Sequence, residues 1–128
     1  MIPLEYRCWN GAKMLSVSKL LIVEQRVLAY CPINRKHYLY PLSTIQIMPY
    51  TGCVDKNNQK IYVGDVVLIT HMLIETIPSY RAIVEWDQYR FVLRALDHAS
   101  TNSFLLPHIN MDFFGLDVMV IGDIYRGY

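Results

Sequence analysis

The sequence of 128 residues contains no long apolar run and no large excess of charge of either sign. No segment approaches the ~20 consecutive apolar residues that span a bilayer, and the N-terminal MIPLEYRCW lacks the regions of a secretion signal. Twelve Lys and Arg against eleven Asp and Glu give a net charge of +1, which supplies no strong field for binding nucleic acid or an anionic membrane. We therefore expect a soluble protein that is not exported and has no membrane partner.

Cysteine and histidine are scarce, and their spacing excludes the common disulfide and metal patterns. Cys8, Cys31 and Cys53 are an odd number without a C-x-x-C pair, which favours reduced thiols in a cytoplasm. The four histidines contain no H-x-x-x-H pair, so a zinc site would have to be assembled from distant loops. The phosphate-binding G-x-x-x-x-G-K-[ST] and the nucleophile motif G-x-S-x-G are missing too. We predict no metal, no cofactor and no enzymatic activity.

The apolar residues make up 53% of the sequence and fall in short runs between turn residues, which indicates a mainly β protein. Asn10-Gly11 separates two alternating runs and predicts an N-terminal β-hairpin with a type I′ turn. Residues 18–30 fit helical spacing as well as two strands, but their β-branched content and the polar Glu24-Gln25 break favour two strands.

Three further segments are predicted as extended chain. Residues 37–50 contain Pro41, which restricts that segment to a sheet edge or a bulge. Residues 61–70 are apolar on both faces and predict a central strand, and residues 117–125 predict the final one. We therefore expect one domain over residues 1–128, mainly β (a β-rich α+β fold) with little helix. In it, the N-terminal hairpin precedes a small SH3-like or partly open barrel.

A second hairpin is predicted at YRAIVEW-DQ-YRFVLRAL. A two-residue turn places Trp86 opposite Tyr89, Glu85 opposite Arg90 and Arg81 opposite Arg94. The two arginines then either separate into water or hold an anion or a partner carboxylate between them. The predicted core face of this hairpin consists of Ala82, Val84, Trp86, Tyr89, Phe91 and Leu93.

Basic and aromatic residues occur together in two places, a pattern typical of surfaces that stack nucleic-acid bases. One is Arg35-Lys36-His37, followed by Tyr38 and Tyr40. The near-neutral charge limits the number of phosphate contacts, so nucleic-acid binding is kept as an alternative that is not favoured. The other place is a candidate binding face on the second hairpin, formed by Arg81, Arg90, Arg94, Tyr89 and Trp86.

The polar stretch YTGCVDKNNQKIYVGD, residues 50–65, could be a ligand loop or a turn. Oxygen-bearing side chains alternate from Asp55 to Gln59, as in a calcium loop, but Lys60 stands where that loop needs Gly and Val66 where it needs Glu. Asp and Asn close their own turns through side-chain bonds and tolerate left-handed φ, and Gly64-Asp65 adds a second tight turn. The stretch therefore predicts a hairpin followed by a kink.

Three segments, YRCWNGAKML, MPYTGCVDKNNQKIYVGDVV and VMVIGDIY, resemble the signature blocks of the YopX-like proteins of bacteriophages and prophages. The middle block is the most specific of the three. Asn58 stands where the family usually has the turn glycine, which Asn can replace because it also accepts positive φ. The positions that match the family motif, expected to act as a structural turn, are Tyr50, Thr51, Gly52, Asp55, Asn57, Lys60, Tyr62, Gly64 and Asp65.

The resemblance implies a small β-rich phage protein, a single YopX-like domain over residues 1–128, with no catalytic role for the motif residues. We expect a non-catalytic accessory protein in the cytoplasm of the bacterial host. Its expected partners are further copies of itself, as a homo-oligomer, or an unknown phage or host protein. A nucleic-acid-binding SH3-like module is the alternative, and fold analogy alone supports it.

Overall fold

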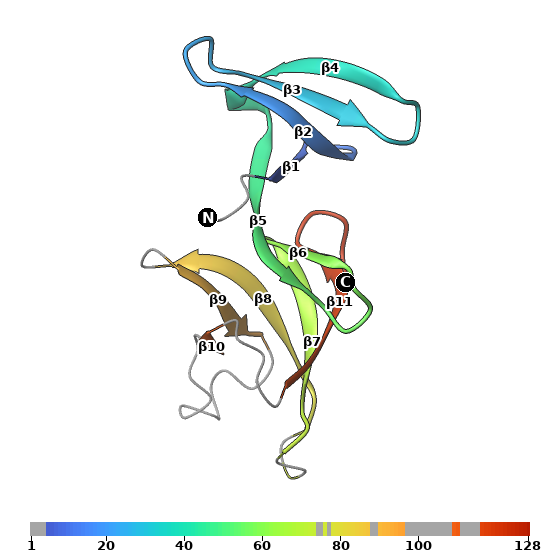
Figure 1. Ribbon diagram of the computed structural model, residues 1–128, viewed down its shortest axis with the longest axis vertical. Coiled ribbons are helices and arrows are strands. Elements are labelled where there is room, and N and C mark those ends of the chain that lie inside the picture. The colour runs from blue at the N-terminus through green and yellow to red at the C-terminus, as the bar shows by residue number, and fades with distance from the viewer. Residues whose placement is uncertain (1–4, 74–75, 77, 88–89, 97–108, 111–115) are drawn as a thin grey trace. The chain divides into compact units, whose positions relative to one another are not determined.

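The computed structural model describes residues 5–73, 76, 78–87, 90–96, 109–110 and 116–128, which form two antiparallel sheets (Figure 1). The single helix in this described part is the three-residue 3-10 turn η1 (Leu42–Thr44), so the mainly β prediction is confirmed. The strands are β1 (Tyr6–Trp9), β2 (Met14–Leu21), β3 (Arg26–Cys31), β4 (Lys36–Pro41), β5 (Gln46–Val54), β6 (Lys60–Tyr62), β7 (Asp65–His71), β8 (Tyr80–Asp87), β9 (Arg90–Ala95), β10 (Ile109–Asn110) and β11 (Leu116–Asp123).

The chain divides into two compact units, Met1–Tyr50 and Thr51–Tyr128. The first sheet has the strand order β4-β3-β2-β1-β5-β6 and the second the order β10-β9-β8-β7-β11. Strand β5 runs from the first unit into the second, so the two units are joined within one strand. Each unit contains its own cluster of buried apolar side chains.

The predicted N-terminal hairpin is present, but its turn differs from the predicted one. Trp9 pairs with Met14, which leaves a loop of four residues rather than two. Gly11 has φ 98° whereas Asn10 does not take a positive φ, as a type I′ turn would require. Instead the Asn10 side-chain oxygen accepts the N–H groups of Ala12 at 2.8 Å and Lys13 at 2.7 Å. The Asn10 side chain thus closes the loop together with the Asn10 backbone, whose N–H donates to Lys13 O at 3.2 Å.

The strand interpretation of residues 18–30 is confirmed, because β2 and β3 occupy them with a turn in which Gln25 has φ 53°. Pro41 ends β4 at the edge of the first sheet, where a missing backbone N–H costs no ladder bond. The core of the first unit is made by Cys8, Leu15, Val27, Ala29, Cys31 and Ile45.

In the second unit, β7 lies between β8 and β11, as predicted for a central strand. The single strand predicted over residues 61–70 is wrong in its extent, because the turn at Gly64 separates β6, in the first sheet, from β7. Its sheet ends at β10 and β11 and does not close into a barrel in the part of the chain that is described. The SH3-like arrangement therefore stays a prediction. The core of this unit is made by Ile61, Val67, Ile69, Tyr80, Ala82, Val84, Leu93, Ala95 and Val118.

The register of the β8–β9 hairpin differs from the predicted one by two residues. Trp86 pairs with Phe91 and Asp87 with Arg90, so Asp87 belongs to the strand and the turn lies one position later. The predicted pairing of Glu85 with Arg90 is therefore wrong, because a cross-strand Asp87–Arg90 pair takes its place. The predicted opposition of Arg81 to Arg94 is wrong for the same reason, since Ile83 lies opposite Arg94.

A shift of two residues keeps each side chain on its predicted face, because strand side chains alternate with a period of two. Ala82, Val84 and Leu93 are accordingly fully buried. Trp86 was predicted in the core but is 52% exposed, since it lies at the end of β8, beyond the buried cluster. Its predicted partner Tyr89 lies outside the described residues.

Candidate functional site

The middle family block is organised around the carboxylate of Asp55, which is only 6% exposed. One carboxylate oxygen, Oδ1, accepts the backbone N–H groups of Asn57 and Gln59, each at 2.9 Å. The other, Oδ2, accepts the N–H of Val120 at 2.9 Å. The backbone closes the same turn, because Asp55 N donates to Gln59 O at 2.8 Å and Asn58 N to Asp55 O at 3.0 Å. Asp55, the first of the alternating oxygen-bearing residues, therefore serves a turn, to which Asn57 and Gln59 contribute backbone groups.

These contacts decide the charge state of Asp55. Burial alone would raise the pKa of this carboxyl, but the N–H groups of Val120, Gln59 and Asn57, together with the Lys56 ammonium, lower it below its usual value near 3.8. Asn58 has φ 64°, as expected for an asparagine at the position of the family glycine. The turn thus holds an ionised carboxylate as an internal acceptor for backbone donors.

A second tight turn connects β6 to β7, and it depends on Gly64. This glycine has φ 93°, the left-handed value expected for it. Its N–H donates to Val84 O at 2.9 Å and its carbonyl accepts the N–H of Ile124 at 3.0 Å. The buried carboxylate of Asp65 accepts the Tyr62 N–H at 2.8 Å. Gly64 is therefore bonded to two chain segments that come from distant parts of the sequence.

The last family block ends in a third acid-centred turn at Asp123, which is completely buried. Its Oδ1 accepts the N–H groups of Tyr125 at 2.9 Å and Arg126 at 2.8 Å, and its Oδ2 lies 2.6 Å from Arg126 Nε. Burial would raise the pKa of Asp123, but the hydrogen bonds and charge of Arg126, with the Tyr125 N–H, lower it. Asp123 also lies opposite Asp65 in the β11–β7 pairing.

The other motif residues support the same turns. Thr51 Oγ1 lies 2.7 Å from Ile61 O and donates to it across the β5–β6 hairpin, and Gly52 has φ 85°. Tyr50 N donates to Glu5 O at 2.8 Å. Lys60 is the exposed first residue of β6. Thr51 and Tyr50 thus bond to backbone groups, and Gly52 adopts a left-handed backbone conformation.

The five residues of the candidate binding face are not brought onto one surface. By the strand alternation, Arg81, Arg90 and Arg94 share one face of the β8–β9 hairpin with acidic residues, whereas Trp86 points to the other face. Arg94 forms a two-bond ion pair with Glu85, at 2.8 Å from Nε to Oε1 and 3.0 Å from Nη2 to Oε2. This contact raises the pKa of the Arg94 guanidinium. The fifth residue, Tyr89, lies outside the described part.

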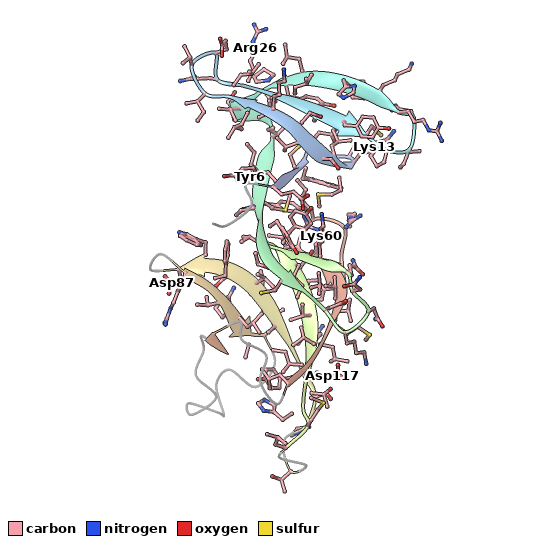
Figure 2. All side chains as sticks on the ribbon, viewed as in Figure 1. Tyr6, Lys13, Arg26, Lys60, Asp87 and Asp117 are labelled. Atoms are coloured by element: carbon pink, nitrogen blue, oxygen red, sulfur yellow. The ribbon has the colours of Figure 1, made fainter. Side chains whose placement is uncertain are left out.

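Arg81 is placed differently from the other two arginines. Its guanidinium lies 5.6 Å from the centre of the Tyr128 ring, a distance at which a cation and an aromatic face attract one another. Asp87 lies at the turn end of the hairpin (Figure 2), on the same face as the arginines. The carboxylates between the arginines reduce the positive potential that the sequence pattern suggested.

An open cleft of about 420 Å³ lies beside Trp86 in the second unit. The Trp86 ring meets the Phe91 ring edge to face at a centroid distance of 4.8 Å, and Ile124 is 47% exposed. The sequence pattern missed this cleft, because Val63 and Ile124 come from segments that only the fold brings together with β8. The cleft is lined by Val63, Gly64, Ile83, Val84, Glu85, Trp86, Asp87 and Ile124.

The basic–aromatic cluster of β4 also differs from a stacking surface. Tyr38 and Tyr40 are half-buried against the core of the first unit. Their hydroxyls accept hydrogen bonds from side-chain amides, Asn34 Nδ2 at 2.6 Å and Asn10 Nδ2 at 3.1 Å. Their rings are therefore occupied in packing and in loop closure. Arg35 and the other basic residues of this cluster remain exposed.

The cysteines are free thiols, and Cys8 and Cys31 are buried in the core of the first unit. Burial raises the pKa of the Cys8 thiol to about 11.

Within the described residues, no three His, Cys, Asp or Glu side chains are grouped so that they could hold a metal ion. No described helix is long and apolar enough to cross a membrane.

The architecture and the acid-centred turns define a small protein of two antiparallel sheets, and comparison with known proteins identifies its kind. The model of the YopX protein family matches residues 5–127, so the chain belongs to that family. A search of curated proteins finds no significant match.

Two solved structures share this fold. Protein yopX from Bacillus subtilis is similar with a TM-score of 0.60 and 18% identity, over 99% of this chain and 96% of its own. Protein EF1440 from Enterococcus faecalis is similar with a TM-score of 0.58 and 18% identity, over 98% and 95%. At this identity the likeness establishes the fold.

Proposed function

We propose that this protein is a non-catalytic accessory protein of a phage or prophage that acts by binding another protein chain. The chain it binds is either a further copy of itself, which makes a homo-oligomer, or a protein of the phage or its bacterial host. The site of action is the host cytoplasm. The observation that supports binding is the half-exposed Trp86 beside the open cleft.

Exposed tryptophans are costly in water and are enriched where protein interfaces derive most of their binding energy. Trp86 and Ile124 present apolar surface at the rim of the cleft, 52% and 47% exposed. The polar residues of the middle block bond mainly to backbone groups, which favours scaffolding over chemistry for them. Both observations favour a protein that acts by binding another protein chain.

The experiment is light scattering of the purified chain over a range of micromolar concentrations. We expect an assembly larger than a monomer, and we expect Trp86→Ala to shift it towards the monomer. Ile33→Ala is the matched control, because Ile33 is 81% exposed and lies in the first unit. A chain that stays monomeric at every concentration would contradict the proposal that the protein forms a homo-oligomer.

The host- or phage-protein version is tested by affinity capture from induced cells. We expect a partner that the wild-type chain retains and that Trp86→Ala loses, while Ile33→Ala keeps it. A strict monomer that captures no protein partner would overturn the proposal. Nucleic-acid binding stays the alternative prediction, tested by retention on single-stranded DNA or heparin. No retention at about 50 mM salt would contradict it.

A further inference from the structure

The edge strand β4 has backbone hydrogen-bonding groups that point away from its sheet. Among the described strands, β4 pairs with β3 alone. Residues of an antiparallel strand alternate between facing the neighbouring strand and facing away from it. Leu42 N donates to Gln25 O at 2.9 Å in the β3–β4 register, and this bond sets the alternation. The backbone N–H and C=O groups of Tyr38 and Tyr40 therefore point towards β3, and those of His37 and Leu39 point away from it.

The side chains of β4 leave this edge open to an added strand. Leu39 is 49% exposed and His37 is exposed, with its ring 5.0 Å from the ring of Tyr30. The two tyrosines lie on the core face, with the hydroxyl contacts described above. Strand β4 thus has edge backbone groups and one exposed apolar side chain, Leu39, available for binding. These groups suit an added strand better than stacked nucleic-acid bases.

Charge is distributed unevenly between the two units. Residues 1–50 contain six Lys or Arg and two Asp or Glu, a net charge of +4, whereas residues 51–128 contain six and nine, a net charge of −3. The exposed Arg35 and Lys36 lie at the start of β4. At its other end Arg26 pairs with Pro41 and its side chain extends outward (Figure 2). The edge therefore has positive charge at its start, and Arg26 of β3 adds a positive side chain on the face of the sheet that Leu39 occupies.

We propose that β4 binds an extended acidic segment of a partner protein as an additional strand of the first sheet. The N–H and C=O groups of His37 and Leu39 pair with the backbone of that segment, and its apolar side chains meet Leu39. Its carboxylates lie on the other face of the added strand and meet Arg35 and Lys36. A second copy of β4 fits less well, because that segment contains no Asp or Glu to meet Arg35 and Lys36.

The inference rests on the proposed function in one respect, that the protein acts by binding protein. The probe is a peptide of roughly seven residues that alternates glutamate and valine, the length of an average strand. The readout is amide hydrogen exchange of the full chain, followed by NMR. We expect the peptide to slow exchange at His37 and Leu39 by about tenfold or more, with a smaller effect at Tyr38 and Tyr40, which already face β3.

Two further peptides separate backbone pairing from charge. Methylation of alternate peptide nitrogens removes the donors that a strand needs, and we expect at least about a tenfold weaker complex. Replacement of glutamate by glutamine in the peptide should weaken binding by a similar factor. An N-methylated peptide that binds equally well, or unchanged exchange at His37 and Leu39, would overturn the proposal.

Charge reversal in the protein provides the matched variants. Arg35→Glu with Lys36→Glu should weaken binding of the peptide about tenfold or more, and the effect should shrink with added salt. The control is Lys19→Glu with Lys60→Glu, which makes the same change in net charge at exposed positions of β2 and β6. Equal losses from both double variants would overturn the proposal.

A single-stranded DNA probe distinguishes the nucleic-acid outcome. If the DNA binds and the peptide does not, the proposal is overturned and the basic edge serves nucleic acid. If the peptide fails while Trp86→Ala still abolishes assembly or capture, the proposed function stands without this surface. If the peptide binds and Trp86→Ala has no effect, the β4 edge is the binding surface and the cleft is not.

Discussion

The carboxylate of Asp55 accepts the backbone N–H of Val120 at 2.9 Å, across 65 positions of sequence. Next to this bond, Lys56 N donates to Val118 O at 3.0 Å and Lys56 Nζ lies 3.2 Å from an oxygen of Asp117. The turn of the middle family block is thereby fixed to strand β11, which forms most of the last block. The two blocks are therefore parts of one structural unit.

We predict that Asp55→Ala lowers the free energy of unfolding by about 2–4 kcal/mol, because the N–H groups of Asn57, Gln59 and Val120 lose their buried acceptor. Urea denaturation followed by circular dichroism measures the change. The control is Lys56→Ala, which removes the exposed ion pair with Asp117 and the positive charge near Asp55 but leaves the hydrogen bonds of the Asp55 carboxylate in place; it should cost less than about 1 kcal/mol. Equal losses in the two variants would show that the Asp55 carboxylate is not the centre of this turn.

Gly64→Val should lower the free energy of unfolding by about 1–3 kcal/mol, because Gly64 has φ 93° and a β-branched residue is strained there. Asn58→Gly is the reverse test at φ 64°. It should leave stability unchanged or raise it by up to about 1 kcal/mol, since glycine takes this conformation without a steric cost. Thermal melting of both variants checks the pair, and an unchanged melting temperature in Gly64→Val would contradict the prediction.

The features that the sequence predicted correctly depend on local chemistry. The left-handed backbone at Asn58 and Gly64, the strands on either side of Glu24-Gln25 and the edge position of Pro41 each follow from residues within a few positions. The position of the loop between β1 and β2 is predicted correctly, but its turn type is not. The Asn10 side chain accepts N–H groups of this loop, which allows a longer loop than the type I′ turn.

The features that could not be predicted depend on contacts between distant segments. The Asp55–Val120 bond has no local signal, because its two partners are 65 positions apart in the sequence. Moving the β8–β9 turn by one position along the chain changes every cross-strand partner while the apolar alternation stays the same. Trp86 fits that alternation, and only the fold shows that the core ends before it.

The β8–β9 register can be tested by a double-mutant cycle. Glu85 and Arg94 should show a coupling free energy of about 0.5–1 kcal/mol, because the contact has two parallel bonds but both side chains are partly exposed. Glu85 and Arg90 should show a coupling near zero, since Arg90 lies opposite Asp87. Single and double alanine variants in urea denaturation give both values. A larger coupling for Glu85 with Arg90 would favour the register predicted from the sequence.

Acid should destabilise this protein through its buried carboxylates. The pKa values of Asp55 and Asp123 lie below the usual value near 3.8 in the folded chain, so the unfolded chain binds protons more tightly. Their contribution to stability is complete above the unfolded pKa and is lost as pH falls through the folded values. The free energy of unfolding should therefore decrease from about pH 5 downwards, measured by urea denaturation at a series of pH values.

Asp123→Asn isolates one of these two contributions. The variant loses the charge that Arg126 Nε contacts at 2.6 Å but keeps a side-chain oxygen for the N–H groups of Tyr125 and Arg126. It should be less stable than the wild type at pH 7, and the difference should shrink as pH falls below about 4, because the unfolded wild-type chain then binds a proton more readily than the folded chain does. The control is Asp117→Asn, whose carboxylate is partly exposed in its ion pair with Lys56; its effect should be smaller at every pH. A difference between Asp123→Asn and wild type that stays constant with pH would show that Asp123 titrates alike in the folded and unfolded chains.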